Sequence, residues 1–163
     1  MWLLCWLMGV AVIGGYVAAV WRRCGVMESL SESWYVIAHP KWFSVSVCLG
    51  AALEWLALCG GGGGGWVCAL GGVMCLGLFG VGLVPQFRTV DRRAHVWLAV
   101  LSAIGCVGMG WLLEPWLLLV PVVTMCLGVA DDVKDWTWWG ECSLLLHGAV
   151  CVGICLLKGG GLC

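Results

Sequence analysis

The chain has 163 residues, of which 63% are hydrophobic and only 10% are charged. Soluble globular domains carry about 25% charged residues, and the mean hydropathy here is +1.04, so the composition excludes a soluble domain and predicts an integral membrane protein. The formal net charge of -1 excludes the basic surface that a nucleic-acid-binding protein would need.

Six apolar stretches are separated by polar or glycine-rich connections. A membrane-spanning helix needs about 20 mostly apolar residues, so each stretch is interpreted as a span. The predicted fold class is all-α, a polytopic transmembrane helix bundle of about six spans that forms a single domain over residues 1–163. The predicted spans cover residues 1–20, 42–58, 66–84, 94–113, 116–130 and 142–157 approximately.

Two of these spans need comment. The first could be mistaken for a signal peptide, but its positive charges, Arg22 and Arg23, follow the apolar core instead of preceding it, which indicates an uncleaved span. The stretch 116–130 is short for a full crossing unless it begins earlier or the bilayer thins locally.

The first connection, residues 24–41, is the longest polar one. Ser29-x-x-Glu32 matches a capping box and predicts a short helix. Leu30, Trp34 and Ile37 then recur at helical spacing, which predicts a segment lying in the membrane interface with its apolar face down. The second connection, residues 60–65, consists of six glycines and is interpreted as a flexible hairpin.

The basic residues predict the orientation. Seven of the eight Lys and Arg residues fall in the first, third and fifth connections, and only Lys158 falls on the other side. The positive-inside rule makes those three connections cytoplasmic and predicts that both termini lie outside the cytoplasm. Tryptophans near the span ends are expected to mark the two interfaces. Those on the cytoplasmic side are Trp21, Trp42, Trp97, Trp136, Trp138 and Trp139.

The twelve cysteines lie mostly inside apolar runs, and no C-x-x-C pair occurs, so neither a zinc ribbon nor a redox motif is indicated. They are interpreted as small apolar packing residues. Glu54 is expected near the outer interface, ~18 Å along its helix from Trp42, with its carboxylate reaching toward the headgroups.

An acidic motif follows the fifth span. Asp131, Asp132 and Asp135 form a D-D-x-x-D box, whose carboxylates could hold Mg²⁺ and through it a diphosphate. Residues 127–135 resemble the aspartate box of the polyprenyl-phosphate sugar-phosphate transferases, which implies such a site here. The simpler alternative, which we favour, is a solvated acidic loop.

Three histidines form a second candidate site. His39, His95 and His147 lie toward the cytoplasmic ends of the second, fourth and sixth spans, with Asp91 one turn before His95. Three histidines and a carboxylate could bind Zn²⁺ and leave a position for water. The set is loosely similar to membrane hydrolases of the ceramidase and adiponectin-receptor type. The alternative is that each histidine bonds a backbone carbonyl inside the bundle.

Over about 130 residues the chain resembles a group of small, uncharacterised bacterial multi-pass membrane proteins. Ser29 to Tyr35, the Trp42-Phe43 pair and Phe87-Arg88 with His95 carry this resemblance. The resemblance implies a bacterial inner-membrane protein, and we expect a structural or accessory membrane component without a cofactor. Its partners are the lipid bilayer and, as further candidates, other membrane proteins or copies of itself. The alternative is an enzyme that uses Zn²⁺ or Mg²⁺ to act on a lipid headgroup or lipid diphosphate at the cytoplasmic face.

Overall fold

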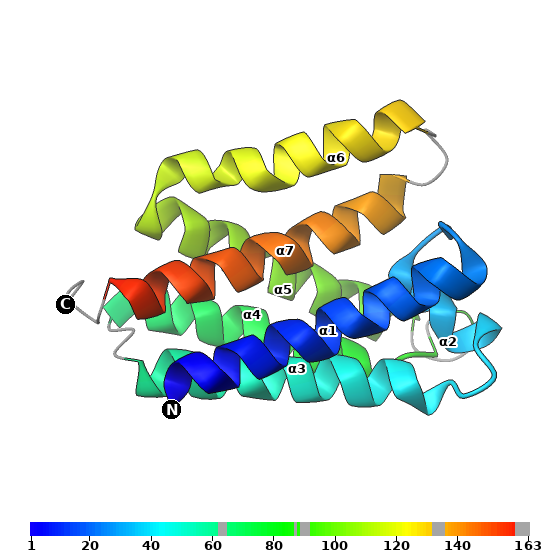
Figure 1. Ribbon diagram of the computed structural model, residues 1–163, viewed down its shortest axis with the longest axis horizontal. Coiled ribbons are helices and arrows are strands. Elements are labelled where there is room, and N and C mark those ends of the chain that lie inside the picture. The colour runs from blue at the N-terminus through cyan, green and yellow to red at the C-terminus, as the bar shows by residue number, and fades with distance from the viewer. Residues whose placement is uncertain (62–64, 87, 89–91, 132–135, 159–163) are drawn as a thin grey trace.

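The protein is a bundle of antiparallel helices in a computed structural model (Figure 1). The structure describes residues 1–61, 65–86, 88, 92–131 and 136–158. For residues 127–131 it describes the backbone only. No strand occurs in these ranges, so the predicted all-α fold is confirmed. The elements are α1 (Trp2–Cys24), η1 (Leu30–Glu32), α2 (Ser33–Val36), α3 (Lys41–Gly60), α4 (Gly65–Leu83), α5 (Arg92–Leu113), η2 (Pro115–Leu118), α6 (Leu119–Asp131) and α7 (Trp136–Leu157).

Five helices, α1, α3, α4, α5 and α7, are long and apolar enough to cross a membrane. The apolar stretch at η2 and α6 is shorter, as the sequence predicts. It nevertheless carries the chain between the two ends of the bundle, because α5 ends beside Lys158 at one end and α7 begins at the other (Figure 1). The structure is therefore compatible with a multi-pass membrane protein of about six crossings.

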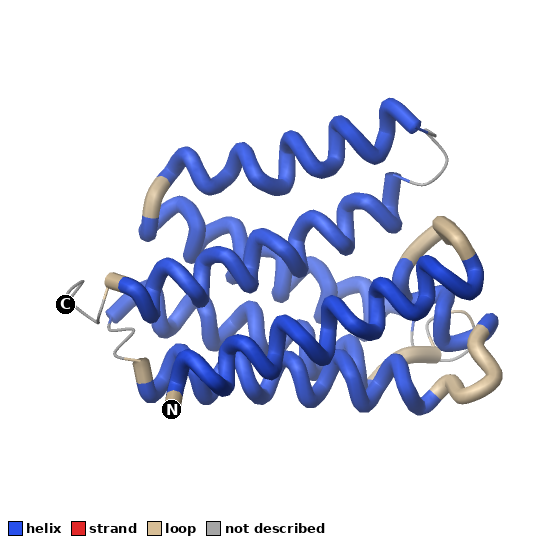
Figure 2. The backbone as a smooth tube through the Cα atoms, viewed as in Figure 1, coloured by secondary structure: helices blue, strands red, loops and turns tan. Residues whose placement is uncertain are grey.

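The helices pack as neighbours in chain order, with two exceptions. α4 lies between α3 and α5, and α1 packs on α3. α7 lies beside α1, α3 and α5, which are distant from it in sequence. α6 lies at the edge of the bundle, mainly against α7 (Figure 1). The connections gather at the two ends of the bundle (Figure 2). This arrangement places segments that are distant in sequence side by side at each end.

Small residues allow the closest helix contacts. A Cβ atom built on Gly77 of α4 would lie 2.5 Å from the backbone nitrogen of Ser102 in α5. A Cβ atom on Gly105 of α5 would lie 2.5 Å from the backbone nitrogen of Met74 in α4. The two backbones therefore touch through reciprocal glycines, as expected for small-residue faces in membrane helices.

The buried cysteines have the packing role that the sequence predicts. Cys75, Cys106, Cys151 and Cys155 are at most 4% exposed and belong to one apolar cluster with Met109. Within the ranges given above, every cysteine is a free thiol.

The start of the last helix corrects the prediction from sequence. α7 begins at Trp136, not at about residue 142. The reason is that Trp138 is only 2% exposed and packs in an apolar cluster with Val20 and Phe43. Trp138 is thus a core residue whose side chain is buried between helices and does not face lipid.

The glycine contacts between α4 and α5 generate a stability prediction. Gly105→Ala forces the two helix backbones apart and should lower the free energy of unfolding by about 1–3 kcal/mol, the usual result of overpacking. The measurement is reversible unfolding in mixed micelles. Gly15→Ala in α1 is the control, because nothing lies within 4 Å of its added Cβ. Equal stabilities for the two variants would contradict the close packing.

Candidate functional site

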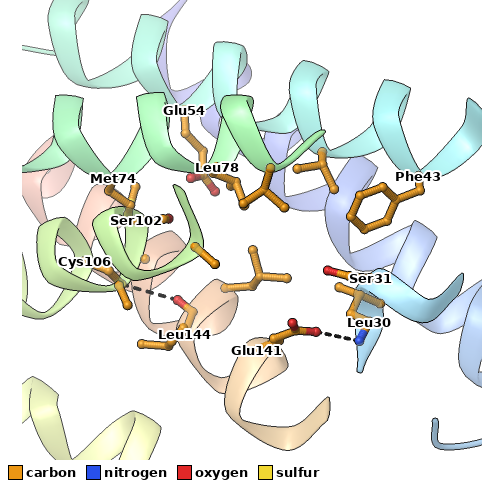
Figure 3. A pocket seen from close by; sticks show the side chains of 16 residues that line it. Leu30, Ser31, Phe43, Glu54, Met74, Leu78, Ser102, Cys106, Glu141 and Leu144 are labelled. Atoms are coloured by element: carbon orange, nitrogen blue, oxygen red, sulfur yellow. Dashed lines mark hydrogen bonds between the residues drawn. The ribbon is translucent and has the colours of Figure 1, made fainter. Parts of the chain in front are cut away.

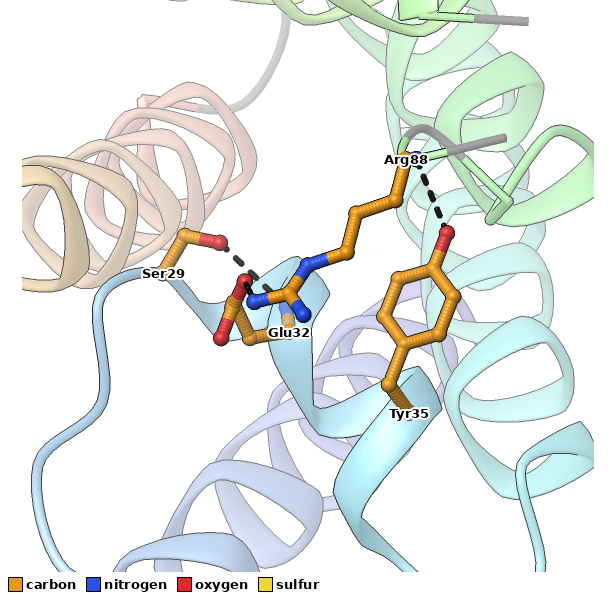
Figure 4. Close-up of polar contacts among 4 residues, drawn as sticks. All are labelled: Ser29, Glu32, Tyr35 and Arg88. Atoms are coloured by element: carbon orange, nitrogen blue, oxygen red, sulfur yellow. Dashed lines mark hydrogen bonds and ion pairs between the residues drawn. The ribbon is translucent and has the colours of Figure 1, made fainter. Parts of the chain in front are cut away.

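Polar side chains from the first and third connections meet at one end of the bundle, called here the loop end (Figure 4). Ser29 Oγ accepts a hydrogen bond from the backbone N–H of Glu32 at 3.3 Å, which confirms the predicted helix cap. The Glu32 carboxylate does not return to Ser29 but pairs with the Arg88 guanidinium. The Arg88 backbone N–H donates to Tyr35 Oη at 2.9 Å, and its guanidinium lies 5.3 Å from the centre of the Tyr35 ring.

Glu141 of α7 joins the same end. The backbone N–H of Leu30, at the start of η1, donates to Glu141 Oε2 at 2.5 Å. Leu30 itself is 4% exposed and packs in the cluster that contains Phe43 and Trp138. The sequence predicts an apolar face formed by Leu30, Trp34 and Ile37, and this face packs against the bundle. The bonds to Glu141 and Arg88 hold the segment there. Its position in the membrane interface stays a prediction.

Two hydroxyl groups fasten the segment to α1. Ser33 is completely buried, and its Oγ donates to the carbonyl of Leu30 at 2.6 Å. Tyr16 Oη in α1 lies 2.5 Å from Ser33 Oγ. Because the Ser33 proton is used for the Leu30 carbonyl, Tyr16 donates and Ser33 accepts.

His95 lies in the first turn of α5, contacts Ser31 of this segment and is 5% exposed. Its Nδ1 is 2.7 Å from the carbonyl oxygen of Val84, and its Nε2 is 3.1 Å from Ser31 Oγ. A carbonyl oxygen can only accept, so Nδ1 carries a proton; in the neutral ring Nε2 then accepts from the Ser31 hydroxyl. The Ser31–His95 pair joins the first connection to α5. The bond from Nδ1 to the Val84 carbonyl matches the alternative in which a histidine bonds a backbone carbonyl inside the bundle.

The three histidines occupy different parts of the bundle. His39 is exposed in the connection before α3. His147 is fully buried, and its Nε2 faces Gly110 of α5 and Cys151. Gly110 follows His95 by about fifteen residues of one helix, so His95 and His147 are ~20 Å apart along the bundle. The structure does not bring these two imidazoles together.

His147 has one unusual feature. Its Nδ1 has no hydrogen-bond partner in the described part of the chain. The carbonyls of Leu117 and Cys106 are the neighbouring acceptors, but neither meets the geometry of a hydrogen bond to Nδ1.

The acidic candidates fall largely outside the description. Asp91, Asp132 and Asp135 are not described, and Asp131 ends α6 with its side chain undescribed. Among the described residues, no group of three or more His, Cys, Asp or Glu side chains could hold a metal ion. The Mg²⁺ and Zn²⁺ hypotheses therefore remain predictions.

A cavity of about 100 Å³ lies between α3, α4, α5 and α7, next to η1 (Figure 3). Ser31, Ser102, Glu54 and Glu141 are the polar residues that line it, and its other lining groups are mainly apolar. Glu54 points into this space from α3 and is only 3% exposed. No hydrogen bond or ion pair to its carboxylate is found among the described residues.

The position of Glu54 corrects the expectation that it reaches toward the outer headgroups. It shares one face of α3 with Val47, Ala51 and Leu58, all of which are buried. These residues follow the spacing of four, three and four that places side chains on one side of a helix. That signal is present in the sequence and could have identified Glu54 as an inward-facing residue.

Comparison with protein-family models, curated proteins and solved structures finds no match for this chain. The geometry of the loop end and of the cavity therefore provides the basis for a functional conclusion.

The bond from Leu30 to Glu141 generates a prediction about the first connection. Glu141→Ala leaves the Leu30 N–H without its partner at a buried site and should destabilise the protein by about 1–3 kcal/mol. Proteolysis within residues 24–41 should also become faster, because the segment is no longer tied to α7. Both effects are measurable on protein in nanodiscs.

Glu28→Ala is the matched control for Glu141→Ala, since Glu28 is exposed in the same connection. If the two variants show the same stability and the same cleavage rate, the proposed tie between η1 and α7 is refuted.

Proposed function

We propose that the protein is an accessory multi-pass component of a bacterial inner membrane, with its loop end facing the cytoplasm and both termini outside. The observation that carries this proposal is the use of the polar residues at the loop end. Glu32 pairs with Arg88, Glu141 binds the Leu30 N–H, and His95 bonds Val84 and Ser31. These groups hold the protein's own connections together, which supports a structural role.

The distribution of basic residues supports the orientation. Arg22 and Arg23 end α1, Lys41 begins α3, and Arg92 and Arg93 begin α5, so these residues cluster at the loop end with Arg88. At the opposite end Lys158 donates to Glu114 at 2.6 Å. An excess of Lys and Arg on one side is the usual mark of the cytoplasmic face.

A second candidate is a metal-dependent enzyme that acts on a lipid headgroup or lipid diphosphate at the cytoplasmic face. The Ser31–His95 pair favours it, because a hydroxyl and an imidazole meet at the loop end of the bundle, beside a cavity. An enzyme of this type would need Zn²⁺ or Mg²⁺ bound in stoichiometric amount.

Reporter fusions test the orientation. A reporter fused after Arg93 should lie in the cytoplasm, and one fused after Gly61 should lie outside, because α4 crosses the bundle between the two positions. Placement of both reporters in one compartment would contradict the proposed orientation and the pooling of polar residues at a single face.

Metal analysis of the purified protein separates the two candidates. An accessory component should contain no stoichiometric Zn²⁺ or Mg²⁺, and His95→Ala should leave the metal content unchanged. Stoichiometric metal that is lost in His95→Ala but retained in His39→Ala, an exposed-site control, would overturn the accessory role in favour of the enzyme.

A further inference from the structure

Glu54 is the one acidic residue that combines deep burial with an open space in front of its carboxylate in the described part of the chain. It is 3% exposed and points into the cavity beside Met74, Leu78 and Ser102 (Figure 3). It lies ~20 Å along α3 from Lys41 at the loop end and ~9 Å from Gly60. An ionisable residue inside a membrane bundle marks a functional site by default.

Among the described residues, no basic group neutralises this carboxylate. The part of the cavity lining that the structure describes includes no Lys, Arg or His. A buried carboxylate without a partner is strongly unfavourable in its charged form. A bound cation with N–H groups would supply both the missing charge and the missing hydrogen bonds.

The lining selects the kind of cation. Mg²⁺ and Ca²⁺ take six or more oxygen ligands, whereas the region around Glu54 adds only the Ser102 hydroxyl to the carboxylate. Ser31 and Glu141 are the other polar residues of the lining, beside Leu30 of η1, and the rest of the described wall is mainly hydrocarbon or sulfur, contributed by residues such as Val47, Leu78 and Cys106. An occupant with one charged end and an apolar remainder matches this distribution better than a bare metal ion does.

The volume sets the size. The cavity measures about 100 Å³, which is smaller than the roughly 150 Å³ cavity that accommodates benzene. It therefore has room for about four non-hydrogen atoms, as in a three-carbon primary amine.

We propose that this cavity is a binding site for a small primary alkylammonium ion, whose NH₃⁺ group bonds the Glu54 carboxylate and the Ser102 hydroxyl while its alkyl chain contacts the apolar walls. Such a group occurs both in free amines and in the headgroup of phosphatidylethanolamine. The depth of Glu54 favours the free amine, because this residue lies ~20 Å along α3 from Lys41 at the loop end.

The test is a ligand-observed NMR titration of the full chain in phosphatidylcholine nanodiscs, in amine-free buffer, with empty nanodiscs subtracted. The probes are n-propylammonium and n-propanol, which have the same number of non-hydrogen atoms. Propylammonium should bind saturably, with a Kd on the order of 1 mM or below for so small a ligand, and at least about tenfold more tightly than propanol, since only it makes charge-assisted bonds. Absence of saturable binding, or equal binding of the alcohol, would overturn the proposal.

Variants assign the binding to the cavity. Glu54→Gln should weaken propylammonium binding at least about tenfold, whereas Glu114→Gln, a carboxylate at the opposite end that pairs with Lys158, should leave it unchanged. Ala103→Leu fills the cavity while keeping Glu54 and should also abolish binding; it decides the matter if Glu54→Gln fails to fold. Full binding by either cavity variant would refute the site.

Lipid composition separates the two sources of the ammonium group. Nanodiscs that contain phosphatidylethanolamine should give the same affinity for propylammonium as those of phosphatidylcholine alone. Loss of propylammonium binding in the presence of phosphatidylethanolamine would overturn the assignment to a free amine.

Discussion

The hydrocarbon core of a bilayer offers no hydrogen-bond partners, and this constraint organises the whole molecule. Polar side chains have to bond one another or lie at the ends of the helices. At the loop end the first and third connections satisfy this requirement together with α5 and α7: Glu32 pairs with Arg88, Glu141 binds the Leu30 N–H, and His95 bonds Ser31 and Val84. The bonds join α1, α3, α5 and α7 through their connections, so the polar groups contribute to the packing of helices that could otherwise slide in lipid.

Within the bilayer the helices depend on shape instead. Reciprocal glycines bring α4 and α5 into backbone contact, and the buried thiols fill the spaces around Met109. Next to this seam an unfilled volume lies between α3, α4, α5 and α7, and Met74 and Ser102 belong both to the seam and to the lining of that volume. Glu54 faces that volume. The same bundle thus contains a tightly packed seam that serves stability and a cavity with an unpaired carboxylate that serves binding in our proposal.

Much of the fold follows from the sequence, because apolar length and basic connections directly reflect the thickness and the sidedness of a membrane. The helix count, the cap at Ser29 and the packing role of the cysteines were predictable for that reason. The start of α7 was not, since Trp138 was assigned to the interface by its residue type, and only tertiary packing makes it a core residue. The inward packing of Leu30 depends on Glu141, a long-range partner that no local pattern reveals.

The candidate sites were less predictable. The position of a histidine in the sequence does not reveal its neighbours in the bundle. His95 lies in the first turn of α5, whereas His147 lies about three turns into α7, so the rise of the helices separates the two imidazoles. Glu54 shows the opposite case, because the spacing of Val47, Ala51 and Leu58 contained the direction of its side chain. The central claim is that the first and third connections meet at one end. Photo-crosslinking from position 35 in native membranes, with benzoylphenylalanine in place of Tyr35, tests it most directly: capture of the peptide that contains Arg88 is the predicted result, and capture of lipid alone or of residues 60–66 would contradict it.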